Sequence, residues 1–143
     1  MKEIVLLFTA LNLLGSTANS EVFRLILGTR SYKSTYGGSD LISASMESLE
    51  ICEANGKDMM RKYQLGTETD VIPYIGYECI KTSSSNSPNY WLIIAGRKWS
   101  TSLLSIPMNS LTQCNTGGEK IMRNNLIHGR VFSHFSYACL SSQ

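Results

Sequence analysis

The chain has 143 residues, of which 13 are Lys or Arg and 11 are Asp or Glu, so its formal net charge is only +2. This balance excludes a strong bulk attraction to nucleic acid or to a membrane surface. Residues 1–20 contain Lys2, an apolar run from Ile4 to Leu14, and then small residues. We expect a secretory signal peptide over 1–20, because this run is too short to span a bilayer. No other apolar run reaches membrane length, so we predict a secreted protein without a membrane partner.

Residues 21–143 are enough for a single domain with one hydrophobic core. They contain all four cysteines, namely Cys52, Cys79, Cys114 and Cys139. An even number of cysteines in a small exported chain favours two disulfides, and no CxxC pair or Cys/His cluster supports zinc. We therefore predict two disulfides, no metal and no cofactor. Three pairings are open, and we favour Cys139 joined to Cys79 or Cys52, with Cys52 bridging a helix to the sheet.

In chain order, the first predicted element is a strand over 22–27, in which alternate residues are apolar. Apolar residues at 42, 46, 49 and 52 then have the spacing of an amphipathic helix over 41–53, which Asn55-Gly56 ends. The following predicted elements are a short helical turn over 57–65 and strands over 71–80, 90–95 and 103–106. Because the strand over 90–95 is apolar on both faces, we place it at the centre of the sheet.

The last third of the chain predicts a closing hairpin. Glu119–Arg123 would form one strand, Asn124-Asn125 the turn, and Leu126–Cys139 a long return strand. The alternation of side chains along that strand would place His128, Arg130, Phe132 and His134 on one face, beside Glu119. The elements together predict an α+β fold, in which one helix packs on a twisted antiparallel sheet, with no internal repeat.

Several residues of this hairpin could serve a ribonuclease, which needs an acid, a base and a cation beside one phosphate. The candidates are His128, His134, Glu119, Arg123 and Arg130. On a straight strand, however, the two histidines would lie about 20 Å apart, too far to act on one phosphate. An exposed strand histidine and an ordinary cross-strand pair of Glu119 with Arg130 explain the same residues. The residues by themselves therefore predict no catalytic set.

Arg97-Lys98-Trp99 places two basic residues beside an aromatic one. This combination is typical of grooves that bind single-stranded nucleic acid, and Arg123 and Arg130 would add phosphate contacts. An anchored Trp flanked by two snorkelling side chains would have the same sequence. We therefore hold these five residues as RNA-binding candidates.

Residues 103–139, which include IPMNSLTQCNTGGEKIMRNNLIHGRVFSHFSYAC, resemble the last third of the small guanyl-specific fungal ribonucleases. There, an apolar strand ending in Pro leads to a Gly-rich loop, a strand carrying Arg and a strand carrying the catalytic His. The chain also resembles the ribonuclease-like effectors that powdery mildew fungi secrete into plant cells. Tyr77-Glu78-Cys79 has the form of their Tyr-x-Cys motif, although it follows the predicted helix here and precedes it in those effectors. By position, Arg123 matches the phosphate-side Arg and His128 or His134 the general acid, while the strand with the base Glu has no match.

The resemblance implies a ribonuclease-like fold that has lost catalysis, because an acid and a base act as a unit. We therefore expect a secreted, monomeric effector that is not an enzyme and that can be translocated into the host cytoplasm. It would bind host RNA or host proteins and could be recognised by a plant immune receptor. The alternatives are an active secreted endoribonuclease using His128 or His134, and a small disulfide-bonded inhibitor or ligand binder.

Overall fold

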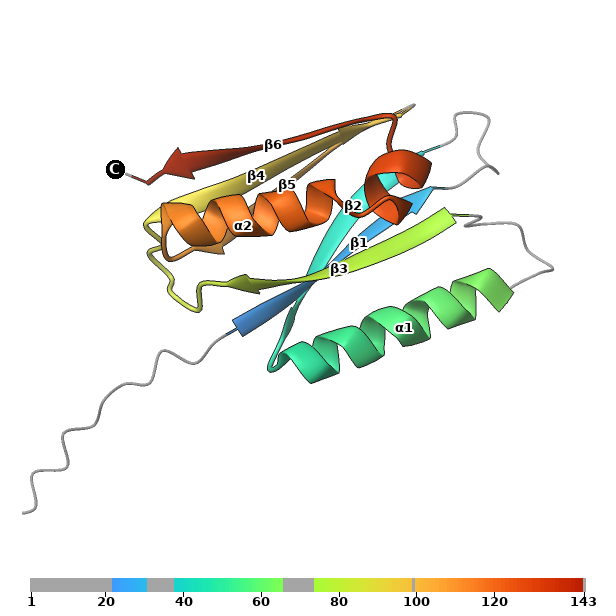
Figure 1. Ribbon diagram of the computed structural model, residues 1–143, viewed down its shortest axis with the longest axis horizontal. Helices are drawn as coiled ribbons and strands as arrows, with labels where there is room; N and C mark the ends of the chain where they lie inside the picture. Colours follow the sequence, from blue (N-terminus) through green and yellow to red (C-terminus); the bar gives the residue numbers. More distant parts are fainter. Residues whose placement is uncertain (1–21, 31–37, 66–73, 99, 143) are drawn as a thin grey trace, which may run out of the picture.

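The computed structural model describes residues 22–30, 38–65, 74–98 and 100–142. Its strands form two three-stranded antiparallel sheets, sheet A with the order β2-β1-β3 and sheet B with the order β5-β4-β6 (Figure 1). The strands are β1 (Val22–Arg30), β2 (Ser39–Met46), β3 (Tyr74–Thr82), β4 (Tyr90–Arg97), β5 (Thr101–Met108) and β6 (His134–Ser141). The helices are α1 (Leu49–Leu65), α2 (Leu111–Met122) and the short π-helix η1 (Leu126–Val131). Among these described helices, none is both long and apolar enough to cross a membrane.

The chain contains an internal repeat, so the expectation of none is wrong. The order strand–strand–helix–strand occurs twice, as β1-β2-α1-β3 (unit 1) and β4-β5-α2-β6 (unit 2), and both sheets place the unit's first strand in the middle. The motif Met-x-Ser-Leu-x2-Cys-x3-Gly-x3-Met-Arg begins at Met46 and again at Met108. Tyr-x-Cys then recurs near the end of each unit, at 77–79 and 137–139. The mixed helix-and-strand class and the antiparallel pairing are confirmed, but the described residues form two α-helices, a short π-helix and two sheets in place of one helix on one sheet.

Each unit has one disulfide that joins its helix to its last strand. Cys52 of α1 is bonded to Cys79 of β3, and Cys114 of α2 to Cys139 of β6. The prediction of two disulfides, with Cys52 bridging a helix to the sheet, is confirmed. The favoured pairing of Cys139 is wrong, because each cysteine pairs within its own unit.

A tyrosine ring lies against a helix glycine beside each disulfide. A Cβ atom added to Gly118 would lie 2.3 Å from Cδ2 of Tyr137, and one added to Gly56 would lie 2.2 Å from Cδ2 of Tyr77. At Gly117, one residue earlier in α2, the nearest atom would be a methyl carbon of Met108 at 3.4 Å, which is ordinary contact. The absent side chains at Gly56 and Gly118 thus allow the rings to touch the helix backbone, at some cost in helix propensity.

We expect Gly118→Ala to destabilise the protein by roughly 1–3 kcal/mol, because the ring or the helix must move to admit the methyl group. The matched change Gly117→Ala should be neutral or stabilise the protein by up to about 1 kcal/mol, because alanine favours the helix. Urea unfolding followed by far-UV circular dichroism measures both changes. Equal unfolding midpoints for the two variants would contradict the close packing of Tyr137 on α2.

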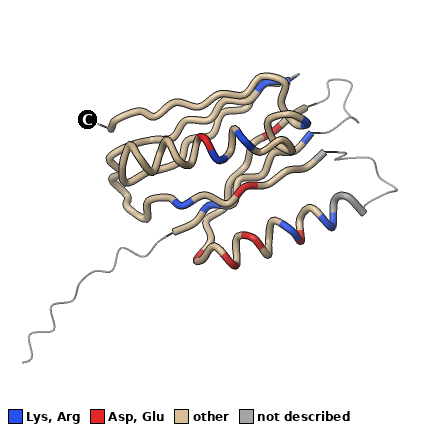
Figure 2. The backbone as a smooth tube through the Cα atoms, viewed as in Figure 1, with Lys and Arg blue, Asp and Glu red and all other residues tan. Residues whose placement is uncertain are grey.

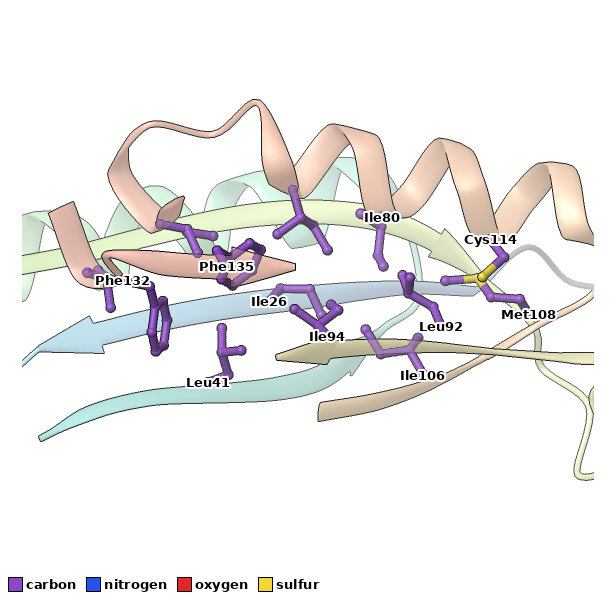
Figure 3. Close-up of a cluster of buried hydrophobic side chains, with 13 residues drawn as sticks. Ile26, Leu41, Ile80, Leu92, Ile94, Ile106, Met108, Cys114, Phe132 and Phe135 are labelled. Atoms are coloured by element: carbon purple, nitrogen blue, oxygen red, sulfur yellow. The ribbon is translucent and has the colours of Figure 1, made fainter. Parts of the chain in front are cut away.

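Figure 1 shows α1, sheet A and unit 2 stacked in that order. α1 packs on one face of sheet A, over the Cys52–Cys79 disulfide. The other face of sheet A packs on unit 2 and forms the main core with α2, η1 and sheet B (Figure 3). This core consists of buried residues from both units, namely Ile26, Leu41, Ile80, Leu92, Ile94, Ile106, Met108, Cys114, Ile121, Ile127, Val131, Phe132 and Phe135.

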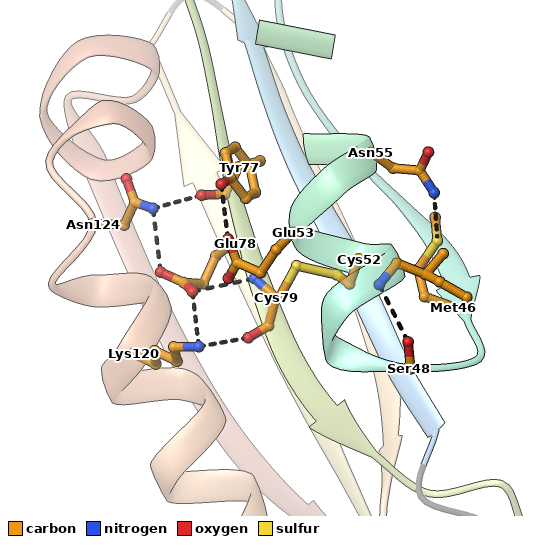
Figure 4. The surroundings of a disulfide bond; sticks show 11 residues. Met46, Ser48, Cys52, Glu53, Asn55, Tyr77, Glu78, Cys79, Lys120 and Asn124 are labelled. Atoms are coloured by element: carbon orange, nitrogen blue, oxygen red, sulfur yellow. Dashed lines mark hydrogen bonds and ion pairs between the residues drawn. A yellow bond between two sulfur atoms is a disulfide. The ribbon is translucent and has the colours of Figure 1, made fainter. Parts of the chain in front are cut away.

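Polar contacts also join the units, between α2 and β3 (Figure 4). Lys120 Nζ donates to the backbone oxygen of Cys79 at 2.7 Å and lies 3.0 Å from Glu78 Oε1. Behind them, the Tyr77 hydroxyl donates to Glu53 Oε2 at 2.8 Å. Burial, together with this hydrogen bond to a carboxylate, raises the pKa of Tyr77 to about 12, so its hydroxyl keeps its proton well into alkaline solution.

The predicted closing hairpin is wrong, because its first strand is part of a helix. Ser110 Oγ caps α2 by accepting a hydrogen bond from the backbone N–H of Gln113 at 3.1 Å. The buried residues Cys114, Gly118 and Ile121 then recur at helical spacing along one side of α2. Glu119, expected on a strand, is therefore an exposed helix residue.

The predicted turn at Asn124-Asn125 immediately precedes η1, and Asn125 is the N-cap of that helix. Asn124 Oδ1 accepts hydrogen bonds from the backbone N–H groups of Leu126 and Ile127, at 3.1 and 3.3 Å. Only the part of the expected return strand from His134 onward is a strand. Residues 126–131 form a tight helical bend, which changes the direction of the chain between the two histidines.

The first predicted helix is displaced along the chain. Most of its first half belongs to β2, and α1 begins at Leu49 and continues to Leu65, so it includes the helical turn predicted over 57–65. Asn55-Gly56 does not end α1, because Gly56 is the position on which Tyr77 packs. The prediction of a central strand over 90–95 is confirmed by β4, which lies between β5 and β6.

Candidate functional site

A cleft of about 470 Å³ lies at one end of sheet B, beside η1. Neighbouring strands contribute its floor, and η1 contributes one wall. Its lining residues are Ala95, Gly96, Arg97, Thr101, His128, Ser133, His134, Phe135 and Ser136. Among them, Arg97 and His134 are directly paired across β4 and β6, so the register of sheet B brings their backbones together.

The connection from η1 to β6 fixes the wall of the cleft. Ser133 donates to the backbone oxygen of Arg97 through its backbone N–H and through its Oγ, both at 3.1 Å. Phe132 is fully buried, with its ring so close to Gly96 that a Cβ there would lie 2.6 Å from Cδ1 of the ring. A larger residue at 96 would therefore displace the buried ring that holds the end of η1 in place.

Both histidines line this one cleft, which a straight strand would have prevented. His128 lies on η1, half-buried, with its ring centroid 6.0 Å from that of Phe135 and tilted by 54°. His134 is exposed at the start of β6, and its Nδ1 lies 3.2 Å from Ser133 Oγ. The expectation that the two histidines are too far apart to meet at one ligand assumed that both lie on one straight strand. Because the chain bends through η1, both histidines instead line the same cleft.

The other predicted site residues do not line the cleft. Glu119 and Arg123 face one another on α2, with Arg123 Nη2 at 3.4 Å from Glu119 Oε2, and both side chains are exposed. Arg130 is exposed on η1, and its backbone oxygen accepts a hydrogen bond from Arg30 Nη1 at 2.9 Å. Lys98 follows β4 but is not among the lining residues. Trp99 lies outside the described residues.

The ionisable side chains that line the cleft are all basic. Its lining contains a guanidinium and two imidazoles but no carboxylate. Arg97 is also the only Asp, Glu, Lys or Arg residue in the three strands of sheet B, so that the blue of Figure 2 marks only one end of this sheet. Hydroxyl groups of Thr101, Ser133 and Ser136 supply further hydrogen-bonding groups. Such a set suits an anion, above all a phosphate group.

The described residues contain no cluster of His, Cys, Asp or Glu side chains that could hold a metal ion. Of the residues that line the cleft, sequence reasoning identified Arg97 and the two histidines but missed Thr101, Ser133 and Ser136. No spacing in the sequence singles out these three hydroxyl residues, because the bend through η1 and the register of sheet B bring them to the cleft.

No protein-family model matches this chain, and comparisons with curated proteins and with solved structures found no match either.

Proposed function

We propose that this protein is a secreted binding protein, without catalytic activity, that holds phosphate groups of single-stranded RNA in the cleft beside η1. It would act in the manner of the secreted effectors that its sequence resembles, on RNA of a host cell. The observation that carries this proposal is the cleft lined by Arg97, His128 and His134 without a carboxylate. Two stacked ββαβ units differ from the single helix on a sheet that the resemblance implies, so the proposal rests on the cleft and not on the fold.

Binding suits this cleft better than catalysis. Arg97 is exposed at the end of β4 and can present its planar group to a phosphate. Glu119, the candidate base, instead pairs with Arg123 on α2. Acid–base cleavage of RNA would then depend on the two histidines alone.

An active endoribonuclease is a second candidate, favoured by one specific observation. His128 and His134 line the same cleft, so one imidazole could remove a proton from the 2′-hydroxyl while the other donates a proton to the leaving oxygen. Arg97 would stabilise the negative charge that develops on the phosphate oxygens. The experiments that test the proposal separate binding from this activity.

We expect Arg97→Ala to weaken binding of a short single-stranded RNA about tenfold, because a hydrogen bond to a charged group is worth roughly 1.5–3 kcal/mol. The slope of log affinity against log salt concentration should also become less steep, by the amount that corresponds to about one lost phosphate contact. Arg61→Ala is the matched control, since Arg61 is exposed on α1 and pairs with Asp58. Fluorescence anisotropy over a range of salt concentrations measures all three proteins. Equal affinities for wild type and Arg97→Ala, or no binding at low salt, would refute the RNA site, and the latter would point to a protein partner.

The same purified protein should leave the RNA intact during prolonged incubation with a metal chelator. His128→Ala and His134→Ala should then change only the affinity. Cleavage that disappears in either histidine variant, with binding retained, would overturn the non-catalytic proposal and establish the second candidate. Gel analysis of end-labelled RNA distinguishes these outcomes.

A further inference from the structure

The two units have the same architecture but different surroundings. We call the face of each sheet that carries the unit's own helix its helix face, and the opposite one its bare face. The bare face of sheet A is covered by unit 2, whereas no described element covers the bare face of sheet B (Figure 1). Equivalent positions in the units follow from the strand pairing, since Leu25 lies opposite Cys79 as Leu92 lies opposite Cys139.

Three apolar residues on the bare face of sheet A are buried in the core between the units. Ile26, Leu41 and Ile80 are exposed by only 0, 6 and 2%. Their equivalents on the bare face of sheet B are Ile93, Leu103 and Leu140. Ile93 is half-buried, and Leu103 and Leu140 are 65 and 54% exposed. Unit 2 thus retains, on an open surface, the apolar side chains that unit 1 uses to bind unit 2.

The strand part of the surface that receives such a face is also present twice, on β5 and on β2. On the helix face of sheet B, Ile106 and Met108 of β5 are fully buried in the core that contains Ile26, Leu41 and Ile80. The equivalent surface on β2 of sheet A is largely open, although Met46 packs beside α1. It consists of Ile42, which is 51% exposed, together with exposed Ala44 and half-buried Met46.

These two open surfaces account for the most exposed large apolar side chains in the described part of the chain. Leu103, Leu140 and Ile42 are exposed by 65, 54 and 51%, while the next, Leu111, is exposed by 47%. Large apolar side chains gathered on exposed sheet faces mark an interaction surface. The partner they fit is one that offers the complementary surface, and this chain offers it.

We infer that the protein associates head to tail with copies of itself. The bare face of sheet B in one copy, formed by Ile93, Leu103 and Leu140, packs on the β2 surface of the next copy, formed by Ile42, Ala44 and Met46. This contact repeats, between copies, the contact that joins the two units within one copy. It differs from the monomer that the sequence predicts.

A polar detail of the internal contact can also be reproduced. Within the chain, β2 lies against β5, and Ser102 Oγ accepts a hydrogen bond from the backbone N–H of Leu41 at 2.9 Å. The equivalent residues between copies are Asp40 and Leu103. Asp40 is exposed, so its carboxylate can accept the corresponding hydrogen bond from Leu103. Its charge is also opposite to that of Arg97 at the end of sheet B.

The association joins two different surfaces, so it leaves one of each free at the ends of every assembly. Such heterologous contacts form rings if the rotation closes and open filaments if it does not. A two-fold dimer formed by two bare faces of sheet B is the competing arrangement. The two differ in whether the β2 surface takes part.

Sedimentation velocity across a concentration series tests this inference with three single variants at exposed positions. Leu103→Lys blocks the bare face, Ile42→Lys blocks the β2 surface, and Leu111→Lys is the control on α2, outside both surfaces. We expect wild type and Leu111→Lys to show assemblies that grow with concentration. Leu103→Lys and Ile42→Lys should each associate at least about tenfold more weakly, because a lysine charge would have to be desolvated in the contact. Circular dichroism and thermal unfolding establish that all variants are folded.

Mixing the two blocked variants gives the most specific result. An equal mixture of Leu103→Lys and Ile42→Lys keeps one intact surface of each kind, so it should form a complex of two chains that does not grow further. A wild-type protein that stays monomeric up to its solubility limit would overturn the inference. Association that Leu103→Lys abolishes but Ile42→Lys leaves unchanged, with no complex between the two variants in the mixture, would overturn it in favour of the two-fold dimer.

Discussion

Ile94→Asp is expected to abolish folding, whereas Ile93→Asp, one residue earlier, should leave the protein folded. Ile94 lies on the helix face of sheet B and is fully buried in the main core. An unpaired carboxylate there costs several kcal/mol, which is comparable with the total stability of a small domain. Ile93 lies on the bare face and is half-buried, so an aspartate at this position stays in contact with water.

Expression in an exporting host, followed by chemical denaturation of the purified proteins, measures this difference. Ile93→Asp should show a cooperative unfolding transition, and Ile94→Asp should show none or fail to accumulate. Although β4 is apolar on both faces, only one of these faces is covered by other residues that the structure describes. A folded Ile94→Asp variant, or an Ile93→Asp variant as unstable as Ile94→Asp, would contradict the assignment of the two faces.

Removing either disulfide is expected to cost about 3.5 kcal/mol on the chain-entropy model. The bonded cysteines are separated by 27 residues in unit 1 and by 25 in unit 2, so the loop terms are nearly equal. Replacing Cys52 and Cys79 by Ala should be the more destabilising change, by roughly a further 1 kcal/mol, because both sulfurs lie among buried residues. Cys139, by contrast, is half-buried.

Guanidinium denaturation of the two double-alanine variants, compared with wild type, gives these free energies of unfolding. The comparison is internally matched, since each variant removes one helix-to-strand bond from the same fold. Equal losses would show that packing around the sulfurs contributes nothing beyond the loop. A greater loss for the Cys114 and Cys139 variant would contradict the burial argument.

The sequence by itself determined the number of disulfides, the central place of β4 and the mixture of helix and strand. These conclusions rest on local signals, namely cysteine number and the apolar run over 90–95. It also contained the repeat, through two copies of one motif that begin at Met46 and Met108. Recognising that motif would have predicted the second helix and the pairing of cysteines within each unit.

The glycines of α2 show why the last third of the chain was misjudged. Gly117-Gly118 predicts a flexible loop when local propensity alone is considered. In the fold, Gly118 is required by the Tyr137 ring, which comes from a strand 19 residues later in the chain. Packing over that separation outweighs the cost of glycine in a helix, and no local pattern reveals it.

The candidate cleft was likewise predictable only in part from the sequence. Sequence identified Arg97, His128 and His134 as the chemically capable residues. Only the tertiary structure decided that they line one cleft, because the hydrogen bonds of η1, such as that from Phe132 N to Ile127 O at 3.0 Å, bend the chain between the histidines. Tertiary structure likewise decided which apolar faces are covered: equivalent isoleucines and leucines of the two units are buried or exposed according to whether another unit lies on them.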